Sequence, residues 1–136
     1  MVKIGDMTIQ NQADILPVIF VGYVSYDLST TGALIITGIG FKPRNIILLG
    51  AAGSGAWSIN VITAPGGGTN QIRGVASYNE ETADRVNTVG PHTIVTGTGA
   101  EAYLQLASYD TNGFTLTKSK SGSPTGTGHI SYWAFK

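Results

Sequence analysis

The chain has 136 residues, and its eight Lys and Arg balance eight Asp and Glu, so the formal net charge at pH 7 is zero. Charged residues make up only 12% of the chain and the cations are scattered, which argues against a nucleic-acid partner because phosphate binding requires a basic patch. The sequence contains no cysteine, which excludes disulfide bonds and thiolate metal sites.

The composition favours a single all-β domain spanning residues 1–136, with residues 1–15 as an N-terminal arm or an edge strand. The 19 glycines are about twice the usual share, and Thr and Ser are also abundant. These residues disfavour helices and suit short strands joined by tight turns. The first residues lack the layout of a signal peptide, and the longest apolar stretch is far shorter than a membrane span, so no membrane partner is expected.

The first strong strand is predicted at residues 15–26, and it is entered at Pro17. Because it is apolar on both faces, we expect it to lie in the centre of a sheet. A turn follows at residues 28–33. Further strands are predicted, in chain order, at residues 33–37, 44–49, 57–62, 72–78, 93–96, 102–108, 114–118 and 129–135.

The connections between these strands are less uniform. Residues 79–87 hold the densest charge in the chain and form either an exposed loop or one turn of helix. Residues 104–109 and 114–117 predict a tight hairpin, because Asn112 and Gly113 are residues that adopt the positive φ of such a turn. Residues 119–128 are almost wholly Ser, Gly, Thr and Pro, which predicts a flexible loop.

The last strand shows the clearest alternation. Ile130, Tyr132 and Ala134 fall on one side, and Ser131, Trp133 and Phe135 fall on the other. Roughly nine or ten short strands at this spacing predict an antiparallel β-sandwich that is jelly-roll-like.

No catalytic, cofactor or metal site is predicted, and the chain is not expected to be an enzyme. His92 and His129 are the two histidines, and neither has a carboxylate or second His at ligand spacing, so both are interpreted as surface residues. Ser54 lacks the glycine spacing of a hydrolase nucleophile. Paired carboxylates for glycoside cleavage, most of which lie in predicted turns or the charged segment, would have to come from Glu80, Glu81, Asp84, Glu101 or Asp110.

Aromatic residues leave two readings open. They could stack on sugar rings, or they could pack in a core or against a neighbouring subunit, which is the commoner role of a strand aromatic. The candidates are Trp57, Tyr78, Tyr103, Tyr109, Tyr132, Trp133 and Phe135.

Three stretches carry a family resemblance: residues 37–50 (TGIGFKPRNIILLG), 107–117 (ASYDTNGFTLT) and 129–135 (HISYWAF). Together they resemble a β-sandwich module of tailed-bacteriophage virion proteins, over roughly residues 30–136. Such modules occur in capsid decoration or cement proteins and in tail or fibre tips. The shared motifs are turn glycines and core strands, so the resemblance implies fold and virion context and assigns no binding residue.

The resemblance and the low charge together predict a viral structural protein on the capsid surface of a virion. We expect a decoration or cement protein that stabilises the shell, with the major capsid protein and copies of itself, as a homotrimer, for partners. The alternative is a tail-fibre or receptor-binding module that recognises host-surface carbohydrate through its aromatics and loops, including residues 66–70 and 119–128.

Overall fold

The computed structural model describes the backbone of residues 2–4, 7–9, 18–52, 57–63, 71–77, 85–87, 92–97 and 99–136, and side chains within residues 18–52, 96 and 99–136. Throughout these ranges the regular structure is antiparallel β-strand, and the prediction of an all-β chain is confirmed. Within the same ranges there is no helix long and apolar enough to cross a membrane.

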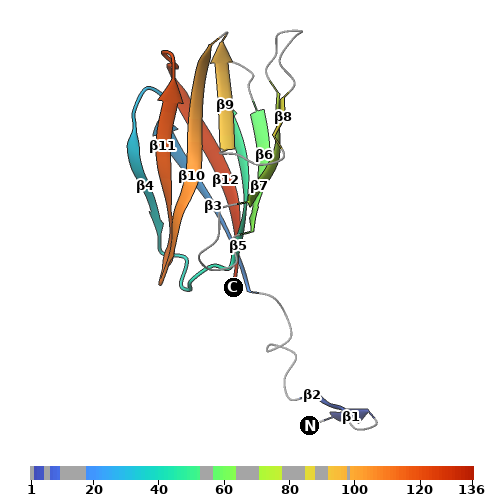
Figure 1. Ribbon diagram of the computed structural model, residues 1–136. Helices are drawn as coiled ribbons and strands as arrows, with labels where there is room; N and C mark the ends of the chain where they lie inside the picture. Colours follow the sequence, from blue (N-terminus) through green and yellow to red (C-terminus); the bar gives the residue numbers. More distant parts are fainter. Residues whose placement is uncertain are drawn as a thin grey trace.

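Two antiparallel sheets form the body of the molecule (Figure 1). One sheet has the order β4 (Gly32–Thr37), β11 (Gly113–Ser121), β10 (Ala100–Asp110) and β9 (His92–Gly97). The other has the order β3 (Ile19–Asp27), β12 (Thr127–Phe135), β5 (Asn45–Ala52), β6 (Trp57–Thr63), β7 (Gln71–Ser77) and β8 (Arg85–Asn87). The strands β1 (Val2–Ile4) and β2 (Met7–Ile9) pair with each other in a two-stranded sheet.

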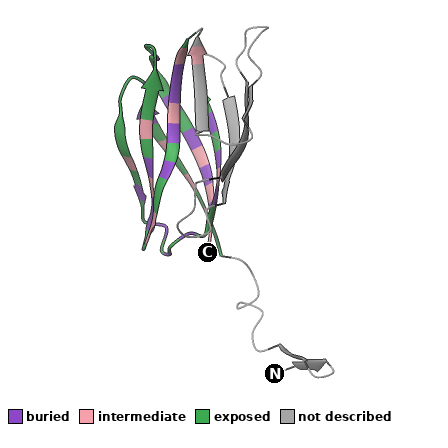
Figure 2. Cartoon of the chain, in the orientation of Figure 1, coloured by how far each residue is buried: buried purple, intermediate pink, exposed green. Residues whose placement is uncertain are grey.

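The core lies between the two sheets, as the burial pattern in Figure 2 shows. Alternate residues of each strand point inward, because successive side chains of a strand point to opposite faces. Phe114 of β11 meets Tyr132 of β12 edge to face, with ring centroids 5.3 Å apart and planes at 86°. The side chains of Ile46, Leu48, Leu104, Leu116 and Ile130 fill the space around this pair and are at most 1% exposed.

The alternation predicted for the last strand is confirmed. Ile130, Tyr132 and Ala134 are buried in the core, whereas Trp133 and Phe135 are half-buried on the opposite face. The final strand pairs with β3 on one side and with β5 on the other, so its outward residues stand in the middle of a three-strand surface.

The predicted hairpin is present, with Asp110 paired to Gly113 at its end. The expected positive φ of Asn112 is wrong, since the positive-φ residues in the described part of the chain are all glycines. Asn112 instead holds the neighbouring loop. Its carbonyl oxygen accepts a hydrogen bond from the Ile39 amide at 3.3 Å, and its Oδ1 accepts one from the Gly40 amide at 2.6 Å.

Two further predictions need correction. The strand predicted at the centre of a sheet is β3, which lies at the edge of its sheet and pairs only with β12 within the described ranges. The predicted loop at residues 119–128 is shorter than expected, because β11 extends to Ser121 and β12 begins at Thr127. Residues 10–17 and 78–84 lie outside the described ranges, as do residues 66–70.

Candidate interaction surface

The edge strand β3 exposes apolar side chains on the outside of its sheet. Ile19, Val21 and Tyr23 are 47%, 60% and 63% exposed. The intervening residues Phe20 and Val24 point the other way and pack against the core. An apolar pattern on both faces of a strand normally marks burial on both sides. Here one of the two apolar faces is open to solvent.

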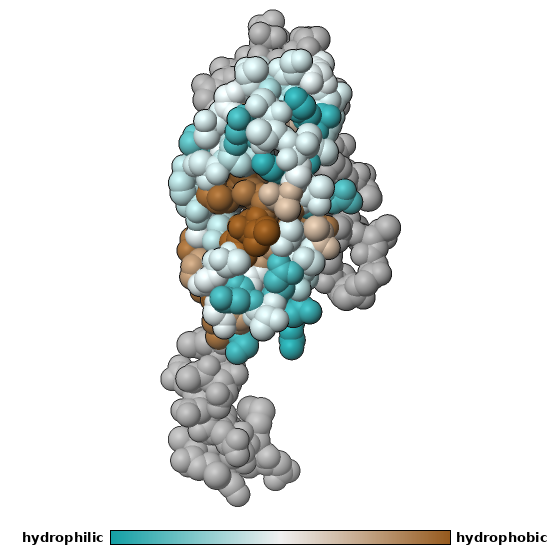
Figure 3. All heavy atoms as spheres, turned by 90° about the vertical axis from the view of Figure 1, so that its left-hand side faces the viewer, coloured by the Kyte–Doolittle hydropathy of each residue, from teal (hydrophilic) through white to brown (hydrophobic). Residues whose placement is uncertain are grey.

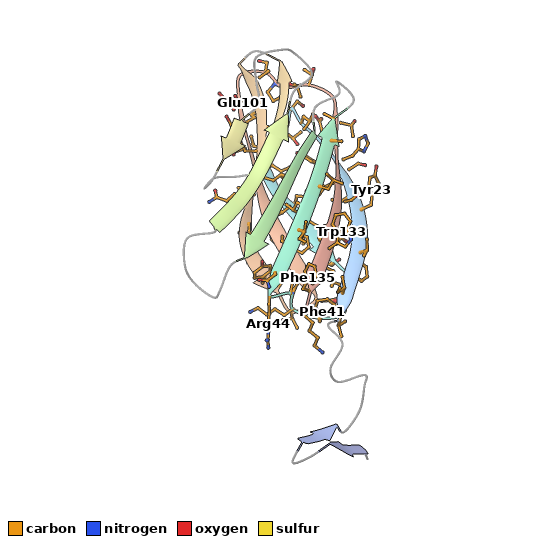
Figure 4. The ribbon with its side chains drawn as sticks, turned by 90° about the vertical axis from the view of Figure 1, so that its right-hand side faces the viewer. Tyr23, Phe41, Arg44, Glu101, Trp133 and Phe135 are labelled. Carbon is orange, nitrogen blue, oxygen red and sulfur yellow. The ribbon has the colours of Figure 1, made fainter. Side chains whose placement is uncertain are left out.

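The apolar surface continues across the two neighbouring strands. Phe135 and Trp133 of β12 pair with Ile19 and Val21, and Trp133 pairs in turn with Ile47 of β5. Leu49, one register step further, is 37% exposed. We call this surface the outer face; it consists of Ile19, Val21, Tyr23, Ile47, Leu49, Trp133 and Phe135, and Figure 4 labels Tyr23, Trp133 and Phe135 on it.

Among the residues whose side chains the structure describes, charged residues flank the outer face at its two ends. Asp27 stands at one end of β3, and Arg44 precedes β5 at the other end, where its amide donates a hydrogen bond to the Phe135 carbonyl (Figure 4). An apolar centre with a polar rim is the usual anatomy of a protein interface. The face is also built on three hydrogen-bonded strands, so its backbone is pre-formed.

A small polar cluster interrupts the outer face toward Asp27. The hydroxyl of Tyr23 lies 2.7 Å from Ser25 Oγ and 2.7 Å from His129 Nδ1, and Ser25 Oγ lies 3.0 Å from the same nitrogen. The Tyr23 and His129 rings stack with centroids 6.0 Å apart. The prediction of a surface position for His129 is confirmed. The hydrogen bonds of this cluster fix the orientation of the Tyr23 ring on the outer face.

This cluster does not have the geometry of a catalytic triad. Both hydroxyls contact the same ring nitrogen of an exposed histidine, whereas a triad needs a nucleophile on one nitrogen and an orienting acid on the other. No group of three or more His, Cys, Asp and Glu in the described part of the chain is placed to hold a metal ion.

The two carboxylate candidates that the structure describes, Glu101 and Asp110, lie at opposite ends of β10. Glu101 on β10 is 7% exposed and accepts a hydrogen bond from the Tyr103 hydroxyl at 2.5 Å. Asp110 lies in the hairpin at the other end of β10, where hydrogen bonds from the Ser108 and Thr115 hydroxyls lower its pKa. The side chains of the other candidates, and of two candidate aromatics, lie outside the described residues: Ser54, Trp57, Tyr78, Glu80, Glu81, Asp84 and His92.

A second apolar surface lies beside the outer face, where the sandwich ends. The last residue of β3 and the first of β4 are joined by a short turn, so these two edge strands stand next to each other. Ile35 of β4 is 64% exposed, and Phe20, Val24 and Leu34 pack against the core from this edge. We call these four residues the open side. Figure 3, which views the molecule from the side of β4, shows hydrophobic residues gathered midway along it.

The turn between the same two strands borders a shallow, open depression. It is lined by Ser25, Tyr26, Asp27, Ser29, Thr125, Gly126 and Thr127. The side-chain and backbone hydrogen bonds from Ser29 lower the pKa of Asp27, and Lys118 donates a hydrogen bond to Thr30 Oγ1 nearby. The Asp27 carboxylate is therefore hydrogen-bonded within the turn, and the depression is too open to enclose a small molecule.

Comparison with protein families, curated proteins and solved structures gives no match. The outer face and the open side are features that sequence reasoning did not single out. The sequence signal for the outer face was the apolar run from Ile19 to Val24. Its apolar residues on both strand faces were interpreted as evidence of burial on both sides.

Proposed function

We propose that this protein is a structural component of a phage virion, a capsid decoration or cement protein that binds the shell through its outer face. The carrying observation is the contiguous apolar surface of the outer face, which Asp27 and Arg44 flank at its ends. The resemblance of residues 37–50, 107–117 and 129–135 to phage virion modules supports the viral context.

The shape of the surface supports a protein partner. Ligand pockets are concave and enclose most of a small ligand, whereas the outer face is one side of a three-strand layer. Exposed apolar patches of this kind, rimmed by polar groups, mark protein contacts. Low charge also favours association, because few charged groups need to be desolvated when the surface is covered.

The proposal includes the finer features expected from the sequence. The domain is a jelly-roll-like sandwich of nine or ten strands, and it acts as a homotrimer with the major capsid protein as its partner on the capsid surface. The insertion of β12 between β3 and β5, and the position of β11 beside β4, support the jelly-roll description.

The test is binding to purified empty shells. Leu49→Glu places a charge on the outer face, beside Ile47 on β5, and we expect it to abolish co-sedimentation with the shells. Gln105→Glu is the matched control, because Gln105 is exposed on β10 in the opposite sheet. Shell binding that is equal in both variants, or absent from the wild-type protein, would refute the proposal.

A carbohydrate-binding role is the second candidate, and one observation favours it. Tyr23 is 63% exposed, and its hydroxyl is held by Ser25 and His129, which presents the ring to a flat ligand such as a sugar. The aliphatic neighbours Ile19, Val21 and Leu49 offer a sugar no hydrogen bonds. A glycan array decides between the two roles. If the protein binds a glycan, Tyr23→Ala abolishes that binding, and the protein is located in the virion tail, the carbohydrate-binding role replaces the capsid proposal.

A further inference from the structure

Within the part of the chain that the structure describes, no strand pairs with the outer edge of β3 or of β4. β3 pairs in continuous register with β12, and β4 pairs in continuous register with β11, so neither edge contains a bulge. Neither strand contains Lys or Pro, and the one charged residue is Asp27 at the end of β3. Natural proteins blunt exposed edges with bulges, charges or proline, because an open edge offers its backbone groups to another strand.

These edges also carry the apolar residues of the open side. Ile35 is 64% exposed on β4, and Val18, which immediately precedes β3, is 48% exposed. The open side therefore combines two requirements of strand addition: unpaired backbone groups along a strand, and apolar side chains beside them. A surface of this kind is stable in water when a partner covers it.

We infer that copies of this chain associate with one another through the open side, with edge strand against edge strand. The inference deepens the self-association in the proposed function and names its surface. A second copy supplies an edge of the same length and the same lack of charge, so contact between copies creates no like-charge repulsion. The net charge of zero removes the long-range repulsion between copies as well.

The size of the open side suits such a contact. The nine residues of β3 extend for about 30 Å, and two packed sheets with their outer side chains are roughly 20 Å thick. One copy therefore covers on the order of 600 Å², which is about 1,200 Å² for the pair and lies at the lower end of specific interfaces. The contact is sufficient for a specific oligomer and small enough to depend on its apolar centre.

The first experiment measures oligomeric mass by light scattering on the full chain. We expect the wild-type protein to be larger than 14.2 kDa, and Ile35→Lys to shift it to the mass of a single chain. Gln105→Lys, a matched change in the interior of the same sheet, should keep the wild-type mass. Circular dichroism checks that both variants are folded. A monomeric wild-type protein, or an Ile35→Lys variant with unchanged mass, overturns the inference.

Cross-linking gives an independent measurement, because the chain has no cysteine of its own. If β4 of one copy pairs with β4 of another, oxidation should link chains that carry Ile35→Cys alone. If β3 of one copy pairs with β4 of another, oxidation should link only chains that carry both Val18→Cys and Ile35→Cys. Both patterns support the inference. Absence of any link in both variants, with Gln105→Cys as the background level, contradicts it.

The two proposals fail separately. A chain that binds shells as a monomer contradicts the inference and the proposed homotrimer, and leaves the proposed capsid-binding role standing. A chain that associates through Ile35 but ignores the shells keeps the inference and contradicts the capsid proposal.

Discussion

Gly22 in the middle of β3 lets an aromatic ring lie flat against the backbone. It pairs directly with Tyr132, and a Cβ built at Gly22 would lie 2.2 Å from both Cζ and Oη of that ring. The ring is held from two other directions. Phe114 meets it edge to face at 5.3 Å, and Phe20 stacks on it at 6.3 Å. Gly22→Ala must therefore displace a ring that is already packed on two sides.

The expected cost follows from opposing effects. Overpacking a core costs about 1–3 kcal/mol. Weakening two aromatic pairs adds to it, at roughly 0.5–1.5 kcal/mol for a pair that is lost entirely. Replacing glycine by alanine also lowers the conformational entropy of the unfolded chain, which stabilises the folded state by about 0.4–1 kcal/mol. We expect Gly22→Ala to lower the free energy of unfolding by about 1–2 kcal/mol and the Tm by roughly 4–8 °C.

The assay is urea denaturation of Gly22→Ala in two backgrounds, the wild-type protein and Tyr132→Leu. Because Tyr132→Leu removes the ring, we expect Gly22→Ala to be neutral or slightly stabilising in that background. The difference between the two backgrounds measures the contact itself. An equal loss of unfolding free energy in both backgrounds, or no loss in either, would show that the Tyr132 ring does not require glycine at position 22.

Three further predictions concern hydrogen bonds and pH. The buried hydroxyl of Tyr26 finds no partner in the described part of the chain, so Tyr26→Phe should keep or raise the free energy of unfolding at pH 7, by up to about 1 kcal/mol. Burial raises the pKa of Tyr26 above its usual value of 10.0, so the wild-type protein should lose stability above pH 10 and the variant should lose less, as urea titrations at pH 7 and pH 10.5 would show. Asn112→Ala removes the acceptor of the Gly40 amide and should cost about 1 kcal/mol in thermal unfolding, with Thr111→Ala as the unaffected neighbour. Hydrogen bonds lower the pKa of Asp110, so its ionised carboxylate stabilises the fold at pH values above the usual pKa of 3.8, and this stability is lost as the pH falls below that value. Asp110→Asn should therefore flatten the decline of Tm at acid pH. An unchanged decline would contradict the assignment.

The alternation of side chains along β12 was predictable because it depends only on the geometry of an extended chain. Ile130, Tyr132 and Ala134 share a side in any strand, and burying that side is the only arrangement that removes the apolar set from water. The hairpin after β10 followed from local chemistry in the same way. The geometry of its turn did not follow from local chemistry, because Asn112 accepts hydrogen bonds from Ile39 and Gly40, more than 70 residues away along the chain.

By itself the sequence determined the all-β class and the positions of most strands. Only the tertiary structure decided that β3 is an edge strand, because the order of strands in a sheet depends on pairings between distant segments. It also decided that Ile19, Val21 and Tyr23 lie on the exposed side of their sheet, because the packing of the two sheets determines which side of each strand is covered.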